Sequence, residues 1–435
     1  MRRKDSLARL EQHGVAIIPA GWRQSRVKYL GSYMNGYPFK PSDWGTEGRP
    51  ILRIQDLSGS NAEPNRFDGE IAPRYLIRRG DILISWSASL GVYRWAGEDA
   101  WLNQHIFKVE VDRTRLREDF FLWLAEWFIA EMDREVHGST MQHLTADAFG
   151  GFPVLLPPDS QQRAIADYLD RETARIDTLI AAKERVLGLL AEKRRALITR
   201  AVTRGLDPHA PLHDSGIPWL GEIPAHWRAE RLKFNLHGIQ QGWSPQCEAA
   251  AAGPEEWGVL KAGCVNVDVF NPEENKRLPD HEAPLSDLEV RPGDVLMSRA
   301  NTTELLGSAA IVRDVRPRLL LCDKLYRLDV NTVTLLKEFL VYFLRTPSGR
   351  FDFERTATGA SNSMQNISQD VVRNVWLPVP PLEVQRTIVE HIARETWTLD
   401  KVRIATERTI ALLKERRAAL IAAAVSGQID VGAAA

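Results

Sequence analysis

The stretch IPAHWRAERLKF, from Ile223 to Phe234, has an edited copy near the start of the chain, IPAGWRQSRVKY, from Ile18 to Tyr29. A second pair follows in the same order, because RPGDVLMSRANT (Arg291 to Thr302) is similar to RRGDILISWSAS (Arg78 to Ser89). The offset between the copies grows along these segments, as happens when loops differ in length. The sequence therefore predicts an internal duplication whose variable segments tolerate insertions.

A segment of constant length closes each copy and opens with the motif PPxxxQR, at Pro157 and again at Pro380. Apolar residues recur in both segments at alternating spacings of three and four, and strong helix formers fill the positions between them. Each segment is predicted to be one helix of about 40 residues. The two helices are expected to bury their stripes against each other as a coiled coil. The predicted packing positions are Ile165, Leu169, Ile176, Leu179, Val186, Leu190, Leu197, Ile388, Ile392, Leu399, Val402, Leu413 and Leu420.

The variable segments have the sequence pattern expected of mixed α/β globular domains. Short apolar runs are separated by Gly, Pro, Asn and Asp, and each segment has one apolar helical stretch, Phe120 to Met132 and Leu335 to Leu344. The predicted fold class is α+β, with two mixed α/β domains joined by two long antiparallel helices in an internal pseudo-two-fold repeat. The predicted parts are an N-terminal extension (1–17), a first domain (18–157), a first helix (158–204), a connector (205–222), a second domain (223–380), a second helix (381–428) and a C-terminal tail (429–435).

Composition limits the classes of protein to consider. The chain has 435 residues and a formal net charge of -1, so a polyanion must be met by a local patch rather than by an overall positive charge. Cys247, Cys264 and Cys322 form no even disulfide set and lack metal-ligand spacing, which predicts reduced thiols and no metal site. No secretion signal or membrane-spanning run is recognisable, so a cytoplasmic location is expected.

A search for catalytic motifs finds none. No Gly-Lys pair is present, which excludes a P-loop, and NPEE (Asn271 to Glu274) lacks the second proline and the aromatic residue of an adenine methyltransferase motif. His105, His143 and His391 have no nucleophile or carboxylate at a spacing that would indicate a catalytic site, and they are interpreted as structural. A duplicated enzyme would show its site in at least one copy, so a binding protein is favoured. An enzyme with degraded motifs and a coiled-coil scaffold without sequence readout remain as alternatives.

Four stretches together resemble the specificity subunit of a Type I restriction-modification system. They are SGIPWLGEIPAHWRAERLKF (Ser215 to Phe234), VRPGDVLMS, PPLEVQRTIVEHIARET (Pro380 to Thr396) and ERRAALIAAAVSGQID. The resemblance covers nearly the whole chain. It implies a non-catalytic, DNA-binding subunit with two target-recognition domains, each reading one half of a bipartite asymmetric site. The first copy departs from the pattern because it lacks a counterpart of SGIPWLGE.

The resemblance also implies partners. Two methyltransferase subunits would bind this chain, restriction subunits would bind through them, and the complex would carry out N6-adenine methylation and restriction on double-stranded DNA. S-adenosylmethionine, ATP and Mg are expected on the partner subunits, and no cofactor or metal on this chain. An adaptor of a methylation-only or related phage-defence system is an alternative within the family.

Residues that contact DNA are expected among the polar, aromatic and basic side chains of the two domains. Arg and Asn suit bidentate contacts to guanine and adenine, and further arginines suit phosphates. The helix clusters Lys193 to Arg195 and Glu415 to Arg417 are interpreted as solvated faces or docking surface for the methyltransferase. The candidate DNA contacts are Tyr37, Lys40, Trp44, Trp86, Ser87, Ser89, Arg74, Arg78 and Arg79 in the first domain, and Trp243, Ser244, Arg299, Asn301, Thr302, Arg313, Arg316 and Arg318 in the second.

Overall fold

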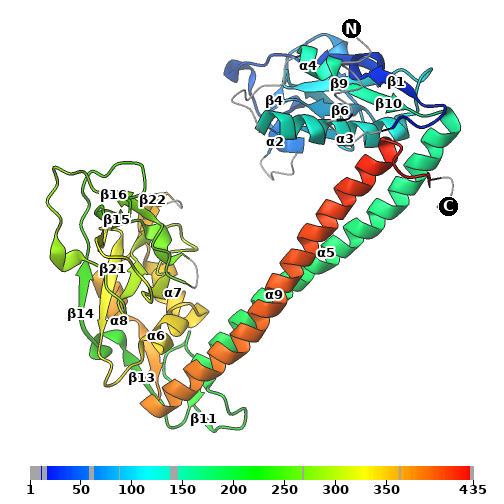
Figure 1. Ribbon diagram of the computed structural model, residues 1–435. Coiled ribbons are helices and arrows are strands. Elements are labelled where there is room, and N and C mark those ends of the chain that lie inside the picture. The colour runs from blue at the N-terminus through cyan, green and yellow to red at the C-terminus, as the bar shows by residue number, and fades with distance from the viewer. Residues whose placement is uncertain are drawn as a thin grey trace. The chain divides into compact units, whose positions relative to one another are not determined.

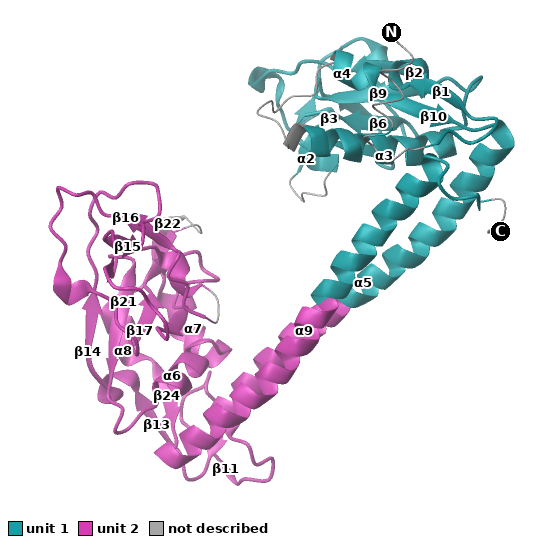
Figure 2. Cartoon of the chain, viewed as in Figure 1, with its two compact units in different colours: residues 1–184, 407–435 teal, residues 185–406 magenta. Residues whose placement is uncertain are grey.

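The computed structural model describes residue 11 and residues 17–57, 63–87, 89–137, 146–266, 269–361 and 364–431. Most of the predicted N-terminal extension, the end of the predicted C-terminal tail and His143 lie outside these residues. The chain divides into two compact units, residues 1–184 with 407–435 (unit 1) and residues 185–406 (unit 2) (Figure 2). Each unit holds one set of strands and parts of two long helices.

Unit 1 is built around an antiparallel sheet in the order β2-β9-β6-β7. Successive side chains of a strand point to opposite faces, and β6 is buried on both. Ile82 and Ile84 pack with Phe120 and Phe128 of α3, which lies along this sheet (Figure 1), whereas Leu83 packs in a separate cluster on the other face. The bounds are β2 (Gly31–Asn35), β6 (Ile82–Ser85), β7 (Gly91–Arg94), β9 (Ile106–Val111) and α3 (Glu118–His137).

A second sheet of unit 1 has the order β4-β3-β8-β5, with β3 and β8 parallel. Its residues Leu52, Ile77 and Leu102 form the cluster that receives Leu83. The main sheet therefore lies between α3 and the second sheet. The remaining bounds are η1 (Val27–Tyr29), η2 (Pro41–Asp43), β3 (Arg49–Leu52), α2 (Ile54–Leu57), β4 (Arg66–Phe67), η3 (Pro73–Tyr75), β5 (Leu76–Ile77), β8 (Ala100–Leu102) and α4 (Ala146–Gly151).

Unit 2 repeats this plan. Its main sheet has the order β14-β21-β17-β19, and its second sheet, β16-β15-β20, again contains a parallel pair, β15 with β20. The bounds are η4 (Leu232–Asn235), β14 (Leu236–Gln241), β15 (Gly258–Leu260), η5 (Ala262–Val265), β16 (Asn275–Arg277), η6 (Ser286–Leu288), β17 (Val295–Ser298), β19 (Ala309–Ile311), β20 (Leu319–Leu320) and β21 (Leu325–Val330).

Unit 2 differs from unit 1 in its domain helix. In place of the single helix α3 it has α6 (Lys337–Leu344) followed by a separate α7 (Pro347–Thr356). Thr346 caps α7 by accepting a hydrogen bond from the backbone N–H of Gly349, and Pro347 occupies its first position, where a missing N–H costs nothing. Further elements are a hairpin of β11 (Leu212–Asp214) with β12 (Glu222–Pro224), a sheet of β18 (Ala300–Asn301), β22 (Thr358–Ser361) and β23 (Met364–Asn366), and α8 (Gln369–Asn374).

The repeated motifs pair at the base of each unit. β1 (Arg23–Arg26), which follows IPAGW, pairs antiparallel with β10 (Pro153–Leu156), directly before PPDSQQR. In unit 2, β13 (Arg228–Arg231) pairs in the same way with β24 (Trp376–Val379). The two ends of each copy are therefore joined by one two-stranded ribbon, and the long helix starts at its end.

The long helices are α5 (Asp159–Arg204) and α9 (Leu382–Val425). In unit 1, Arg417 Nε donates to Asp177 Oδ1 (3.0 Å) and Lys414 Nζ lies 3.6 Å from Glu184 Oε1. The residue numbers of the partners therefore rise along α5 while they fall along α9. The two segments of unit 1 are therefore antiparallel. In unit 2, Arg194 Nη1 donates to Asp400 Oδ2 (3.1 Å). Arg194 and Arg417, interpreted above as solvated or docking residues, thus join the helices.

The buried stripe corrects three predicted packing positions. Ile165, Leu169, Ile176, Ile388 and Ile392 are buried and Leu190, Leu197, Leu399, Leu413 and Leu420 are half-buried, but Leu179, Val186 and Val402 are 51%, 37% and 45% exposed. Leu179 and Val186 each adjoin a second apolar residue, and the neighbours Ile180 and Leu187 are more deeply buried. Beyond Leu399 the stripe passes through Thr406, which is buried because its hydroxyl donates to Val402 O (2.7 Å).

Candidate nucleic-acid interface

One edge of the main sheet of unit 1 collects polar and aromatic side chains. β2 ends at Asn35, β6 ends at Ser85 and β9 begins at Ile106, and the strand registers place these three ends together. The side chains at or just beyond this edge form a group that we call the first rim: Asn35, Tyr37, Trp86, Gln104 and His105.

The first rim is held by contacts among its own members. Trp86 Nε1 donates to Asn35 Oδ1 (3.1 Å), and the Trp86 ring lies 5.7 Å from the His105 ring and stacks on Phe107 at 5.8 Å. Tyr37 turns inward instead and meets Phe39 edge-on, at 4.9 Å. Asn35 and His105 are exposed, so the rim presents amide and imidazole groups beside an aromatic face.

The main sheet of unit 2 has an equivalent edge. β14 ends at Gln241, β17 ends at Ser298 and β21 begins at Leu325. The corresponding group is the second rim: Gln241, Trp243, Arg299, Asp323 and Lys324. Gln241 Nε2 and Arg299 Nη1 both donate to the backbone carbonyl of Asp323, at 3.3 and 3.2 Å.

Three backbone hydrogen bonds are common to the two rims. In the first rim they join Tyr37 N to Leu102 O (2.7 Å), Gln104 N to Tyr37 O (3.0 Å) and Trp86 N to His105 O (3.4 Å). In the second rim they join Trp243 N to Leu321 O (3.1 Å), Asp323 N to Trp243 O (3.0 Å) and Arg299 N to Lys324 O (2.9 Å). The two rims therefore share one backbone arrangement.

The side chains on this common backbone differ at all five positions, although each pair has the same degree of burial. The close approach of the backbone is fixed by glycine. A Cβ on Gly36 would lie 2.2 Å from Asn103 O, and one on Gly242 would lie 2.2 Å from Leu321 O, so neither position accepts a side chain. The two domains thus share one backbone arrangement and carry different side chains on it.

Other predicted contacts of the first domain lie near the rim or on the second sheet. Lys40 is exposed, and Trp44, 41% exposed, has the Arg53 guanidinium 4.8 Å above its ring. Ser87 is half-buried and Ser89 exposed, and Ser89 N donates to Ser87 O (2.6 Å).

The predicted phosphate-binding arginines of unit 1, Arg74, Arg78 and Arg79, are all exposed. Arg74 lies on the ring of Tyr75 and donates to its hydroxyl (2.7 Å). Arg78 Nε lies 4.0 Å from Asp99, and Arg79 Nε donates to Ala96 O (3.0 Å). Each therefore keeps part of its donor set toward solvent.

The predicted residues of unit 2 divide into two groups. Asn301 follows the second rim directly and donates from Nδ2 to Asn266 Oδ1 (2.8 Å), while its Oδ1 accepts from Thr302 N (2.9 Å). Ser244 is exposed beside Trp243, and Arg313 is exposed.

Arg316 and Arg318 hold a loop instead. Arg316 donates to the carbonyls of Glu256 (3.0 Å) and Ala252 (3.2 Å), and Arg318 pairs with Glu255 (3.1 Å). These two arginines therefore have a structural role, because they hold residues 252–256 against the segment that leads into β20.

Asn35, Gln104, Gln241, Asp323 and Lys324 were missed by sequence reasoning, and His105 was interpreted as structural. Gln104-His105 and Asp323-Lys324 occupy short connections before a strand and belong to no recognisable motif. The available signal was positional, because the two pairs stand directly before β9 and β21, the central strands that pair with β6 and β17.

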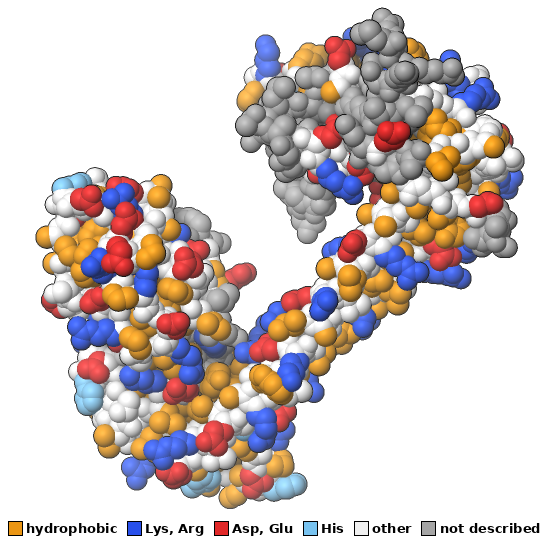
Figure 3. Space-filling view, viewed as in Figure 1, with side chains coloured by type: hydrophobic (Ala, Val, Ile, Leu, Met, Phe, Trp, Pro, Cys, Tyr) orange, Lys and Arg blue, Asp and Glu red, His pale blue; other side chains and the backbone are white. Residues whose placement is uncertain are grey.

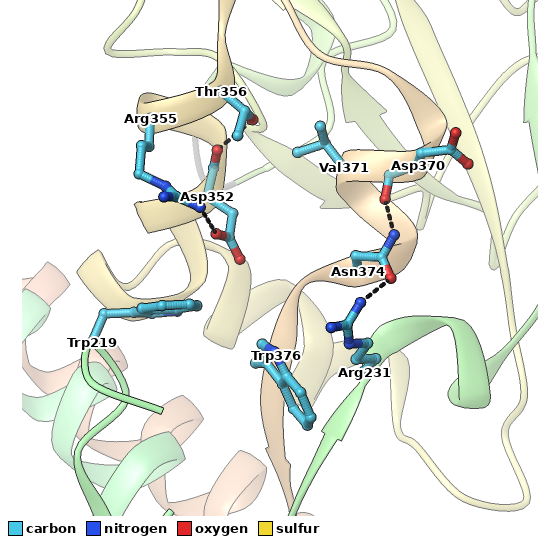
Figure 4. Close-up of a pocket in the computed structure, with 9 residues that line it drawn as sticks. All are labelled: Trp219, Arg231, Asp352, Arg355, Thr356, Asp370, Val371, Asn374 and Trp376. Carbon is cyan, nitrogen blue, oxygen red and sulfur yellow. Dashed lines mark hydrogen bonds and ion pairs between the residues drawn. The ribbon is translucent and has the colours of Figure 1, made fainter. Parts of the chain in front are cut away.

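A cavity of about 360 Å³ in unit 2 is lined by Trp219, Arg231, Asp352, Asn374 and Trp376 among others, but several of its polar groups pair with one another, as Arg231 Nη1 does with Asn374 Oδ1 (2.5 Å) (Figure 4). Among the described residues, no group of three or more His, Cys, Asp or Glu could hold a metal ion.

The cysteines of the described chain are free, and burial raises the pKa of the Cys322 thiol to about 12. Such a thiol stays protonated and unreactive near neutral pH. Basic and acidic side chains are interspersed over the face of unit 2 seen in Figure 3.

Comparisons with known proteins agree with this architecture. Residues 19–187 match the family model described as the Type I restriction modification DNA specificity domain. The EcoBI specificity subunit of Escherichia coli is 22% identical over 432 residues, covering 96% of this chain and 88% of the relative. The MjaVIII specificity subunit of Methanocaldococcus jannaschii is 24% identical over 396 residues, covering 88% and 87%.

A solved structure concerned with complex assembly and conformational transition of the type I R-M system contains a chain of the same fold. Its TM-score is 0.66 at 18% identity, and the alignment covers 95% of this chain and 100% of that chain. The predicted mixed helix-and-strand class is confirmed.

Over most of its length this chain is similar to Type I restriction-modification specificity subunits, in agreement with the resemblance seen in its sequence. A membrane-spanning helix is not found in the described part of the chain, where no helix has the necessary length and apolar character.

Proposed function

We propose that this chain is the sequence-specific DNA-binding subunit of a Type I restriction-modification complex and that each target-recognition domain reads one half of a bipartite asymmetric site. The observation that carries the proposal is the pair of rims. One backbone arrangement that presents two different sets of side chains suits a protein that reads two different short sequences in the same way. Amide, guanidinium and carboxylate groups are those that read base edges in the major groove.

The long helices support the bipartite part of the proposal. α5 has 46 residues, which corresponds to a length of about 69 Å at about 1.5 Å per residue. This length exceeds one turn of B-DNA, about 34 Å. We propose that α5 and α9 form an antiparallel coiled coil that spaces the two domains, so that helix length sets the unread gap and the domains set the bases read.

Phosphate contacts would position the domains without specifying sequence. Arg74, Arg78 and Arg79 are exposed on unit 1 and suit this role. Because the net charge of the chain is only -1, affinity for DNA in isolation should be weak, since counterion release supplies most non-specific affinity. Tight binding would then require partner subunits.

The chemistry is assigned to those partners. Two methyltransferase subunits would bind this chain and carry S-adenosylmethionine, and restriction subunits would join through them with ATP and Mg. This chain would bind double-stranded DNA and no cofactor, and it would not be catalytic. The sequence contains no methyltransferase or P-loop motif that would suggest otherwise.

The test is to co-express this chain with its candidate methyltransferase subunit in a host free of adenine methylation and to map N6-methyladenine across the genome. We expect one split motif that requires this chain. Replacing residues 18–157 with those of another specificity subunit should change one half of the motif and leave the other half intact.

Methylation that is absent, or identical without this chain, would contradict the proposal and favour a coiled-coil scaffold. An adaptor of a methylation-only or related phage-defence system is distinguished by adding the candidate restriction subunit. That adaptor would give the split motif but no cleavage of unmodified DNA.

A further inference from the structure

The rim position that follows the buried serine of the central strand carries the greatest chemical difference between the two copies. Ser85 and Ser298 end β6 and β17 and are both fully buried. The next residue is Trp86 in the first rim and Arg299 in the second, and each donates its backbone N–H to the equivalent carbonyl. Structurally equivalent positions therefore hold an indole in one domain and a guanidinium in the other.

Arg299 is held on several sides. Its backbone N–H donates to Lys324 O (2.9 Å), and its carbonyl accepts from Ile367 N (2.9 Å). Nη1 donates to Asp323 O (3.2 Å), and the guanidinium lies over the ring of Tyr326, 5.7 Å from its centre. Tyr326 is itself buried and fixed by its hydroxyl, which donates to Ile367 O (3.1 Å).

This arrangement leaves the outer edge of the guanidinium available. Nε is shielded from solvent and has no partner, and among the described residues the side-chain hydrogen bond of Arg299 is made by Nη1, not by Nη2. An arginine fixed through one nitrogen and one ring face has little rotamer freedom left to lose on binding. It is arranged to donate two parallel hydrogen bonds from its outer edge.

The neighbouring side chains strengthen the contrast. The second rim also contains Asp323 and Lys324, whose backbone carbonyls accept hydrogen bonds from Arg299, whereas the first rim contains no carboxylate and no lysine or arginine. Trp86 uses its single N–H on Asn35, so it offers only a ring. In the major groove a guanidinium pairs with O6 and N7 of guanine, and a carboxylate accepts from N4 of cytosine.

We infer that Arg299 reads a guanine in the half-site bound by the second domain and that the first domain, with Trp86 at the equivalent position, makes no such contact. The inference rests on the proposed function, because it assumes that the two domains read DNA. It adds the residue, the base and the domain that makes the contact.

The experiment uses the full chain with its methyltransferase partner and compares motifs of the wild type, Arg299→Gln and Arg299→Lys by genome-wide mapping of N6-methyladenine. Lysine keeps the charge but not the planar fork, so both variants should lose the base preference. We expect selectivity at one G·C pair of the second half-site to fall at least about tenfold, while the first half is unchanged. Arg291→Gln, an exposed charge before the other end of β17, is the matched control and should keep the whole motif.

Each result has one meaning. A wild-type chain that directs no split motif would overturn the proposed function. A wild-type split motif that keeps full selectivity in Arg299→Gln or Arg299→Lys, or that lacks a G·C pair in the second half, would overturn the inference alone. If Arg299→Gln lowers the Tm of the complex, Arg299→Lys decides, because it retains the cation over Tyr326. The unchanged first half reports in every case that the complex is assembled.

Discussion

Gln162 and Gln385 make the same three hydrogen bonds in two different units. Gln162 Nε2 donates to Pro157 O (3.0 Å) and Arg115 O (3.2 Å), and its Oε1 accepts from Arg117 N (2.8 Å). Gln385 repeats the set with Pro380 O (2.8 Å), Thr334 O (2.9 Å) and Leu336 N (2.8 Å). Each amide joins the start of a long helix to the segment before the domain helix, which explains why the PPxxxQR motif occurs twice.

Replacing Gln162 with leucine should destabilise unit 1. The change leaves three backbone groups without partners at a site where the side chain is only 2% exposed, and unsatisfied groups of this kind cost about 1–3 kcal/mol each when buried. We expect the free energy of unfolding in urea to fall by about 3 kcal/mol or more. Arg163→Ala, the exposed next residue, is the control, and equal losses in both variants would refute the role given to Gln162.

Three glycines at the long helices should respond in different ways to alanine. Gly205 and Gly427 lie just beyond the ends of α5 and α9, with φ of +75° and +74°, and a Cβ would lie 3.3 Å from Trp227 and 2.4 Å from Pro19. Alanine should therefore destabilise both, by about 1–2 kcal/mol from the backbone alone, and more at Gly427. Gly188 lies inside α5 with open space around it, so alanine there should stabilise by about 0.5–1 kcal/mol. Thermal unfolding of the three variants gives the order, and a loss at Gly188 would contradict it.

The duplication, the two long helices and the mixed domains could be predicted because they depend on repeated motifs and on periodicity. The exact inward face of the helices could not. Leu179 adjoins Ile180 and Val186 adjoins Leu187, and only the partner segment decides which of two adjacent apolar residues is buried. Thr406 could not be recognised as a stripe residue because its polar group is satisfied within its own helix turn.

The candidate site was predicted in part for a similar reason. Tyr37, Trp86, Trp243 and Arg299 lie in segments that align between the copies, so their types drew attention. His105 and its equivalent Lys324 are brought to the rims by strand pairing across the sheet. They are far in sequence from the other rim residues, so no local pattern reveals them. Their common backbone hydrogen bonds, which show that the rims are equivalent, become visible only in three dimensions.

The carboxyl of Asp352 gives a pH-dependent prediction. Burial raises its pKa above the ordinary value of 3.8, although Arg355 and Arg231 oppose the shift. The folded state therefore favours the protonated carboxyl, and stability decreases as pH rises through the folded pKa. Asp352→Asn removes this penalty, so it should be more stable than the wild type at pH 7. The gain should shrink as pH falls toward 4. Urea unfolding between pH 4 and 7 measures it, with exposed Asp329→Asn as the control for charge, and a gain independent of pH would contradict the assignment.

Arg417 is expected to matter more than its neighbour Arg416, although both belong to one basic cluster. Arg417 donates to Asp177 of α5 and to Glu126 of α3 and lies 5.8 Å from the centre of the Trp123 ring, whereas Arg416 is exposed. Arg417→Met should lower the free energy of unfolding by about 1–2 kcal/mol, because two carboxylates lose their partner in a partly buried place. Arg416→Met removes the same charge from the same helix turn and should change stability little. Since salt screens ion pairs, the difference between the two variants should narrow between 0.05 and 1 M NaCl in urea unfolding experiments. Equal losses at all salt concentrations would show that Arg417 contributes only its general charge.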